Sequence, residues 1–443
     1  MGKTPAMSEP GSSTPTTRAD LPLPVERPTP VPVERAGPME GVRVIELAGE
    51  FCAFAGRLLA DAGADVIVIE PPGGSPQRMH APFVDDIEHA ERSLSWWAEN
   101  TSKRSVVLDL DSPEGVRDLA RLVATADVFL EAERPGRLAA LGLDYAEMSG
   151  PNPQLVHVAI TPFGRLGVPD ASEATDLTIL ARGGPMWSCG YDDHELAPVR
   201  GRGNQGIRMA AHFAVMATVT ALLARPRHGG QFVDVSMVAA ANVTTEFSSY
   251  SWLAAQQTVQ RQTGRHATPT PTEPTQVQCS DGRYLNTGVP PRSPGEFAAL
   301  LGWIRDLDVE DEFPMSALLE LGAGFEFITM QMIAEDPLAG EVFQAGREAM
   351  HFIASKVPAH DAFLGFQTRG IAAGVVWSPD EVMADPHFVE RGFPTEVFHD
   401  DLGRTVLYPG APIRFLSTPM GVRSPAPKLG AHTAEVLSEI DDR

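Results

Sequence analysis

Residues 41–74, GVRVIELAGEFCAFAGRLLADAGADVIVIEPPGG, contain two apolar runs that decide the fold class. The runs VRVIEL at 42–47 and ADVIVIE at 64–70 are short and rich in β-branched residues, so each predicts a buried strand. The stretch between them, which includes RLLA at 57–60, predicts a helix. A strand, a helix and a second strand in this order form the unit from which parallel sheets are built.

The same alternation continues along the chain. A helix is predicted to begin at Ser112-Pro113-Glu114, because a serine cap, a proline at the first helical position and an early acid occur together. The chain is therefore expected to be an α/β protein with a Rossmann-like, mostly parallel sheet and helices on both faces. Such sheets bind ligands outside the carboxyl ends of their strands. The further predicted strands are 105–110, 127–130, 155–160 and 230–237.

Four segments are predicted along the 443 residues. The first segment, 1–38, holds nine of the 39 prolines. Proline has no amide donor for a helix or a sheet, so this segment is expected to be a disordered extension. The third is less regular and helix-rich, with a proline- and threonine-rich loop at 267–275 and a hairpin near 279–285. The segments are the extension 1–38, a large Rossmann-like domain 39–240, a smaller α+β domain 241–400, and a C-terminal segment 401–443 that returns to the large domain.

Charge and cysteine content exclude several classes of protein. There are 35 basic and 58 acidic residues, which gives a net charge of −23. This negative field repels nucleic acids and anionic membranes, so neither is an expected partner. The three cysteines, Cys52, Cys189 and Cys279, form no CxxC pair and are odd in number. They indicate neither a disulfide framework nor a cysteine zinc site, and a reducing cytoplasm is the expected location.

One apolar stretch, 207–223, could be a membrane span or a core helix. It is interrupted by Arg208 and His212 and is short for a membrane span. A buried core helix is therefore expected.

Three candidate sites are weak. GRGNQG at 201–206 matches GxGxxG, but no apolar strand precedes it and no acid occurs between 206 and 230, so a dinucleotide site is not expected. No GxSxG nucleophile motif is present. His194 lies among acids but has no second histidine at helical spacing, so it is interpreted as part of a solvated loop, and no metal is expected.

The segment TDLTILARGG at 175–184 places Asp176 at the start of an apolar helical run. From the spacing alone, this acid does no more than complement the dipole of its helix. The string, however, resembles the nucleophile segment of the class III CoA-transferases, the formyl-CoA transferase-like or CaiB/BaiF family. Further motifs resemble that family in the same order, namely AGADVIVIEPPGG at 62–74, NTSKRSVVLDL at 100–110, RPG at 134–136, LGL at 141–143, ITPFG at 160–164, VDVSM at 233–237 and PAPKLGAHT at 425–433.

The resemblance implies an exchange of CoA between an acyl-CoA thioester and a carboxylic acid, in an interlocked homodimer. Asp176 would attack the thioester to form a mixed anhydride and then an aspartyl-CoA thioester. Lys103 and Arg104 would pair with the phosphates of CoA. The other residues that the resemblance places along the CoA site are Glu50, Asn100, Thr101, Ser102, Arg134, Thr161 and Pro162.

Two other functions remain open. An α-methylacyl-CoA racemase shares this fold but needs two bases, and the positions where racemases carry them are Thr175 and Asn204 here. A non-catalytic subunit, which assembles with an active paralogue, is the second alternative. It is favoured by departures from the family pattern: Glu50 replaces a glutamine, Pro71 replaces an arginine, the asparagine of the VENF motif is lost at 130–133, and 265–275 lacks the family's glycine loop.

Overall fold

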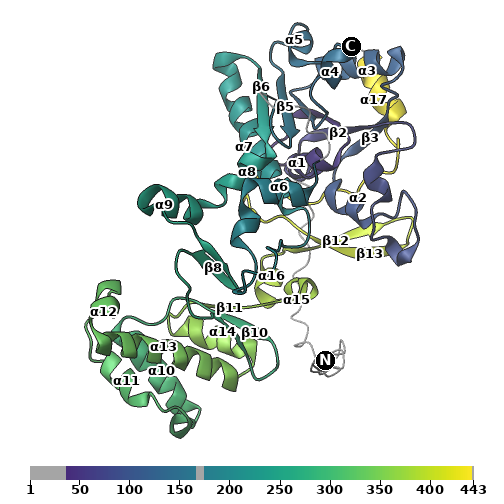
Figure 1. Cartoon of the computed structure of the whole chain (residues 1–443). Helices are drawn as coiled ribbons and strands as arrows, with labels where there is room; N and C mark the ends of the chain where they lie inside the picture. The colour runs from purple at the N-terminus through teal and green to yellow at the C-terminus, as the bar shows by residue number, and fades with distance from the viewer. Residues whose placement is uncertain (1–35, 166–173, 442–443) are drawn as a thin grey trace, which may run out of the picture.

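The computed structural model describes residues 36–165 and 174–441. Its centre is a six-stranded parallel sheet in the order β3-β2-β1-β4-β5-β6 (Figure 1). The predicted strands are confirmed, whereas the predicted disordered extension lies almost wholly outside the described residues. The strand order changes direction between β1 and β4, which is where parallel sheets open a crevice for ligands. The strands are β1 (Arg43–Leu47), β2 (Asp65–Glu70), β3 (Arg104–Val107), β4 (Val128–Glu131), β5 (Val156–Thr161) and β6 (Gln231–Ser236).

Helices cover both faces of this sheet, as predicted. Successive strand residues point to opposite faces, and Val44 and Ile45 accordingly belong to two different hydrophobic clusters. The first cluster joins the sheet to α1, α6, α7 and α8, and the second joins it to α3 and α17. The helices are α1 (Glu50–Asp61), α2 (Leu94–Glu99), α3 (Pro113–Ala124), α4 (Arg137–Ala140), α5 (Tyr145–Met148), α6 (Asp176–Gly183), α7 (Gln205–His228), α8 (Met237–Val243), α9 (Glu246–Ala255), α10 (Pro294–Asp306), α11 (Ser316–Gly322), α12 (Met330–Glu335), α13 (Pro337–Lys356), α14 (Ala359–Thr368), α15 (Pro379–Ala384), α16 (Pro386–Glu390) and α17 (Thr433–Asp441).

A separate hydrophobic core is formed by residues between 279 and 371, mainly from α10, α13 and α14. In Figure 1 these helices lie apart from the large sheet. An antiparallel sheet β11-β10-β9 packs with them, and β9 and β10 form the hairpin expected near Cys279. We propose that this core is the smaller domain. The remaining strands are β7 (Gln260–Gln262), β8 (Arg265–Thr268), β9 (Gln276–Gln278), β10 (Tyr284–Thr287), β11 (Ala373–Val375), β12 (Pro394–His399) and β13 (Arg404–Pro409).

The C-terminal part of the chain returns to the large sheet. β12 and β13 pair with each other, and Val397 and Tyr408 pack against Trp96 and Trp97 of α2. The boundary predicted at residue 400 therefore falls inside a hairpin, and we propose that the returning segment begins with β12. Farther along, the backbone amide of His432 donates to the carbonyl of Ser105 at 3.0 Å, so the tail is attached to the edge strand β3.

Helix α7 is less buried than predicted. Among the described residues, it is the one helix that is long and apolar enough to cross a membrane, by length and composition alone, and 33% of its apolar window is buried. The buried side, which includes Ala210 and Ala214, packs on the sheet and on α1, α6 and α8. Met216 and Leu223 are 57% and 77% exposed. The expectation of a buried core helix is thus correct for one face only.

Candidate functional site

Asp176 is the first residue of α6, and its carboxylate faces the start of α7. The residue is 6% exposed. Its Oδ1 atom accepts hydrogen bonds from the backbone amides of Gly206 at 2.7 Å and Ile207 at 3.1 Å. Its Oδ2 atom accepts one from Nη1 of Arg200 at 3.2 Å. Asp176 therefore satisfies two amides that the first turn of α7 leaves without a helical partner, and it places a negative charge at the positive end of that helix.

The GRGNQG string has a structural explanation at this contact. A Cβ atom at Gly206 would lie 3.2 Å from Oδ1 of Asp176 and 3.0 Å from Cγ2 of Ile179. Glycine at this position lets α6 approach the end of α7 closely. The string thus marks a helix start that is occupied by a side chain of the same protein, in agreement with the rejection of a dinucleotide site.

Glu50 lies at the same helix end. It is the first residue of α1, and its Oε1 atom accepts a hydrogen bond from Nδ2 of Asn204 at 2.9 Å. Asn204 directly precedes α7. The structure thus brings Glu50 and Asp176 to one site and adds Arg200 and Asn204, which no sequence motif had identified as neighbours of Asp176. Thr175 caps α6. The two positions where racemases carry bases are therefore occupied by Thr175, a helix cap, and Asn204, whose side chain is an amide.

The side chains of the segment 100–104 are bound within the protein in this structure, and their expected contacts with CoA stay a prediction. Lys103 is 2% exposed, and its Nζ atom donates to Oε1 of Glu46 at 2.9 Å, to the carbonyl of Ala53 at 2.9 Å and to Oδ1 of Asn100 at 2.8 Å. An ammonium group has three donors, so none is left for a phosphate. Arg104 is bound bidentately by Asp65.

The neighbours of Lys103 are also occupied internally. Arg104 contacts Glu435 and Glu439 of α17 in addition to Asp65. The hydroxyls of Thr101 and Ser102 both donate to the carboxylate of Asp61, at 3.1 and 2.6 Å. Asn100 and Thr101 are fully buried. These residues hold α1, the 100–104 segment and the C-terminal tail together, and the expectation that they also line a channel for CoA stays a prediction.

The remaining predicted residues lie near the carboxyl ends of β4 and β5. Thr161 is the last residue of β5 and is buried, and its Oγ1 atom has no hydrogen-bond partner within the described part of the chain. The carbonyl of Pro162 accepts from the amide of Val238 at 3.0 Å. Arg134 is exposed in the turn after β4. Their expected contacts with CoA stay a prediction.

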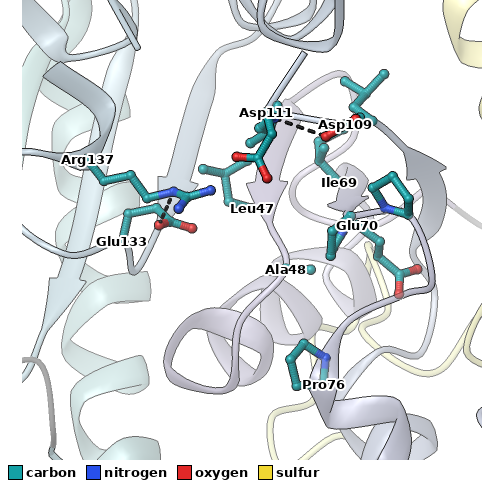
Figure 2. Close-up of a pocket in the computed structure, with 13 residues that line it drawn as sticks. Leu47, Ala48, Ile69, Glu70, Pro76, Asp109, Asp111, Glu133 and Arg137 are labelled. Carbon is teal, nitrogen blue, oxygen red and sulfur yellow. Dashed lines mark hydrogen bonds and ion pairs between the residues drawn. The ribbon is translucent and has the colours of Figure 1, made fainter. Parts of the chain in front are cut away.

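A pocket of about 410 Å³ opens at the carboxyl ends of β1, β2, β3 and β4 (Figure 2). It therefore lies at the change of strand order, where the fold predicts a ligand. Ala48 in its wall is two residues from Glu50, so the turn between β1 and α1 connects the pocket with the Asp176 site. The lining residues are Leu47, Ala48, Ile69, Glu70, Pro71, Pro72, Pro76, Leu108, Asp109, Leu110, Asp111, Glu133 and Arg137.

Over residues 36–165 and 174–441, no group of three or more His, Cys, Asp or Glu side chains is arranged to hold a metal ion. His194 contacts the carbonyl of Arg261 through Nε2 at 3.0 Å, and its neighbour Asp192 pairs with Arg265. The interpretation of this segment as a loop without a metal is compatible with those contacts.

The buried pair of Glu46 and Lys103 predicts a pH-dependent stability. Burial raises the pKa of Glu46 to about 7 from an ordinary value of 4.5. Between pH 4.5 and pH 7, the Glu46 carboxyl is more often protonated in the folded state than in the unfolded state. The free energy of unfolding therefore decreases as the pH rises through this range. The contribution of Glu46 to stability is full below pH 4.5 and is lost as the pH rises toward 7.

Chemical denaturation of the wild type and of Glu46→Gln at a series of pH values tests this expectation. The decrease of the free energy of unfolding across this range should be smaller in the variant. Glu341→Gln, at an exposed position on α13, is the matched control and should follow the wild type. Parallel curves for wild type and Glu46→Gln would contradict the prediction.

Comparisons with known proteins agree with this architecture. The family model for CoA-transferase family III matches residues 39–433. The chain is 31% identical to the succinyl-CoA:(R)-benzylsuccinate CoA-transferase subunit BbsE of Thauera aromatica, over 90% of this chain and 93% of that protein. It is 30% identical to the succinate–glutarate CoA-transferase of Agrobacterium fabrum, over 92% of this chain and 96% of that protein.

A solved structure supports the same assignment. A CaiB/BaiF family protein from Brucella suis superposes with a TM-score of 0.72 at 27% identity, over 92% of this chain and all of that one. The family match covers most of the chain and agrees with the resemblance of the sequence motifs. The chain belongs to CoA-transferase family III.

Proposed function

We propose that this chain is a family III CoA-transferase, an enzyme that moves CoA between an acyl-CoA thioester and a carboxylic acid, and that its Asp176 is the nucleophile. Family membership supports the reaction. Among the relatives, the Thauera protein is itself named as a subunit of a CoA-transferase. The relatives named above act on succinate, glutarate and benzylsuccinate, which are dicarboxylic acids, so a dicarboxylic acid is the proposed acceptor.

The position of the Asp176 carboxylate carries this proposal. Two backbone amides bind Oδ1 and fix the carboxylate, whereas Oδ2 accepts one hydrogen bond, from Arg200, whose side chain is 34% exposed. A carboxylate has about four lone-pair sites, so Oδ2 keeps a lone pair for attack on a thioester carbonyl.

The chemistry follows from this oxygen. Oδ2 would attack the thioester carbonyl, form a mixed anhydride and release CoA thiolate. The thiolate would then attack the aspartyl carbonyl, release the donor acid and leave an aspartyl-CoA thioester. The acceptor acid would attack that thioester, form a second anhydride and release the thiolate, whose attack on the acceptor carbonyl would regenerate Asp176, in a site that excludes water.

The second candidate is a non-catalytic subunit that assembles with an active chain. The name of the Thauera relative, which is a subunit of a CoA-transferase, favours it.

A racemase function is not proposed. Proton removal from either face of a carbon next to a thioester needs two bases. Thr175 and Asn204 hold the two relevant positions, and neither is a base near neutral pH.

The oligomer and location belong to the same proposal. Tyr250, Trp252 and Leu253 of α9 are more than half exposed, which is unusual for large apolar side chains on a free surface. We propose that such side chains are covered in the homodimer that the resemblance implies. A cytoplasmic location, and the lack of nucleic-acid and membrane partners, stay predictions.

Acyl trapping on the full chain distinguishes the two roles of Asp176. The wild type, Arg200→Ala and Asp176→Asn are each incubated with a panel of acyl-CoA thioesters that includes succinyl-CoA, quenched with hydroxylamine or borohydride, and mapped by mass spectrometry. Modification at residue 176 is expected in the wild type and not in Asp176→Asn. A family III CoA-transferase of known activity, treated in parallel, shows that the conditions trap the intermediate. Absence of the label from Asp176 in both the wild type and Arg200→Ala would overturn the catalytic role and establish the second candidate.

A further inference from the structure

Arg200 has hydrogen-bond donors that the described part of the protein does not use. Its Nη1 atom donates to Oδ2 of Asp176 at 3.2 Å and to the carbonyl of Gly201 at 3.1 Å. A guanidinium also has donors on Nε and Nη2. Within the described residues, neither of these atoms has a hydrogen-bond or ion-pair partner, and the side chain is 34% exposed. The edge of the guanidinium formed by Nε and Nη2 is therefore open to a ligand beside the proposed nucleophile.

The same edge of arginine binds carboxylates elsewhere in this protein. Arg78 donates from Nε to Oε2 of Glu70 at 2.6 Å and from Nη2 to Oε1 at 2.9 Å. Arg104 donates from Nε and Nη2 to the two carboxylate oxygens of Asp65, at 2.9 and 2.7 Å. The planar fork of arginine matches the two oxygens of a carboxylate. A carboxylate is thus the ligand that fits the open edge of Arg200.

The segment that precedes Arg200 is attached to β7 independently of Asp176. Arg261 of β7 is 8% exposed. Its Nη2 atom donates to the carbonyls of His194 and Leu196, at 2.9 and 2.7 Å. Because these contacts do not involve Asp176, we expect Arg200 to stay near the site when the charge of Asp176 changes.

The charge of Asp176 changes during the proposed reaction. The free carboxylate is an anion and pairs with Arg200. In the mixed anhydride and in the aspartyl-CoA thioester, the aspartyl group is neutral, so the ion pair is lost. Arg200 is then a cation without its partner next to the acyl group, and it attracts an anion at close range. A carboxylate should accordingly bind better to the acylated chain than to the free chain.

The position of the open edge indicates which carboxylate of a substrate it binds. Nη1 faces Oδ2 of Asp176, and the edge formed by Nε and Nη2 is on the opposite side of the guanidinium. A carboxylate on that edge is too far away to attack the aspartyl carbonyl, because reacting atoms must approach to about 3–3.5 Å. A second carboxylate on the same molecule, separated from the first by a short carbon chain, can reach the carbonyl.

We propose that Arg200 binds the non-reacting carboxylate of a dicarboxylic acid while the other carboxylate attacks the acylated Asp176. The inference rests on the proposed function and deepens it, because it names a residue that selects dicarboxylic over monocarboxylic acids. Arg200 thus has two partners in turn, which are Asp176 in the free protein and the acid in the acylated protein.

Discharge of the acylated chain by two acids tests this role. The wild type and Arg200→Gln are loaded with CoA at Asp176 by an acyl-CoA thioester and freed of excess thioester and released acid by gel filtration. Each is then mixed with subsaturating succinate or with butyrate, which has as many carbons but one carboxylate, and loss of CoA from Asp176 is followed by mass spectrometry. Succinate should discharge the wild type about tenfold faster than butyrate does, whereas Arg200→Gln should be discharged at similar rates by both.

Two further variants separate the contact from the charge. Arg200→Lys keeps the cation but loses the edge with two donors, so it should retain part of the preference for succinate. Arg202→Gln removes the same charge from an exposed side chain two positions along the chain. It is the matched control and should be discharged as the wild type is.

The outcomes distinguish this inference from the proposed function. The role of Arg200 would be overturned by a wild type without preference for succinate, by an unchanged preference in Arg200→Gln, or by an equal loss of preference in Arg202→Gln. Failure of Arg200→Gln alone to load with CoA would also overturn it, because Arg200 would then serve the nucleophile. In all these cases Asp176 remains the nucleophile. Absence of CoA from Asp176 of the treated wild type would remove the proposed function, and this inference with it.

Discussion

Replacement of Lys103 by methionine is expected to lower the free energy of unfolding by about 3–5 kcal/mol at about pH 8, above the pKa of Glu46 of about 7. The ammonium group is wholly buried and lies 2.8 Å from Oε2 of Glu46. Removal of one partner of a buried ion pair leaves the other charge without compensation in a medium that solvates it poorly. The loss should therefore appear in folding, in place of the effect on CoA affinity that the sequence motif implies.

The pH dependence of this loss identifies its cause. Without Lys103, Glu46 can avoid the cost of an unpaired charge by taking up a proton. Urea or thermal denaturation should therefore show a larger destabilisation at about pH 8 than at about pH 5. A loss of equal size at both values would contradict the argument.

Two further variants complete this experiment. Lys103→Met combined with Glu46→Leu removes both charges and should recover part of the stability, because an apolar pair of similar volume replaces a buried ion pair at little cost. Arg104→Met, at the adjacent position, should lower the free energy of unfolding much less than Lys103→Met does, because Arg104 and its acidic partners are partly exposed. A similar loss in both single variants would show that burial of Lys103 is not decisive.

Gly56→Ala is the second substitution for which the structure predicts a large effect. It is expected to lower the free energy of unfolding by several kcal/mol. A Cβ atom at this position of α1 would lie 1.7 Å from Oε2 of Glu46 and 3.1 Å from Nζ of Lys103. The carboxylate would have to leave its position, and the ion pair would be broken in a close-packed interior.

Gly302→Ala is the matched control in a second helix. Gly302 lies within α10, and nothing lies within 4 Å of the position where its Cβ would be. Alanine is preferred over glycine in a helix by about 1 kcal/mol, so this variant should be as stable as the wild type or more so. Denaturation curves in which Gly56→Ala matches Gly302→Ala would refute the role assigned to Gly56.

Strands β1 to β5 of the sheet were predictable from the sequence because they are largely buried on both faces. Continuous apolar runs such as 64–70 have few other interpretations when helical stretches separate them. The length of α7 was predictable as well, but its exposed face was not, since an apolar side chain gives no sign of whether another chain covers it. Met216 and Leu223 illustrate this.

The site was less predictable because its contacts span long separations in sequence. Asp176 and Gly206 are 30 positions apart, and Glu50 and Asn204 are 154 apart. Lys103 looks like an exposed cation in the string NTSKRS, yet its partner Glu46 lies on another strand. A charge in a strand can be exposed or paired internally, and only the three-dimensional arrangement decides between the two.

The attachment of the C-terminal tail to β3 has a consequence for synthesis of the protein. Arg104 of β3 pairs with Glu435 and Glu439, and the amide of Ser105 donates to Nδ1 of His432. These partners are made more than 300 residues after the strand. A nascent chain emerges from the ribosome in order, N-terminal part first. The edge of the first-made sheet thus stays uncovered until residues 432–439 have been made, and during that interval it is open to pairing with other strands.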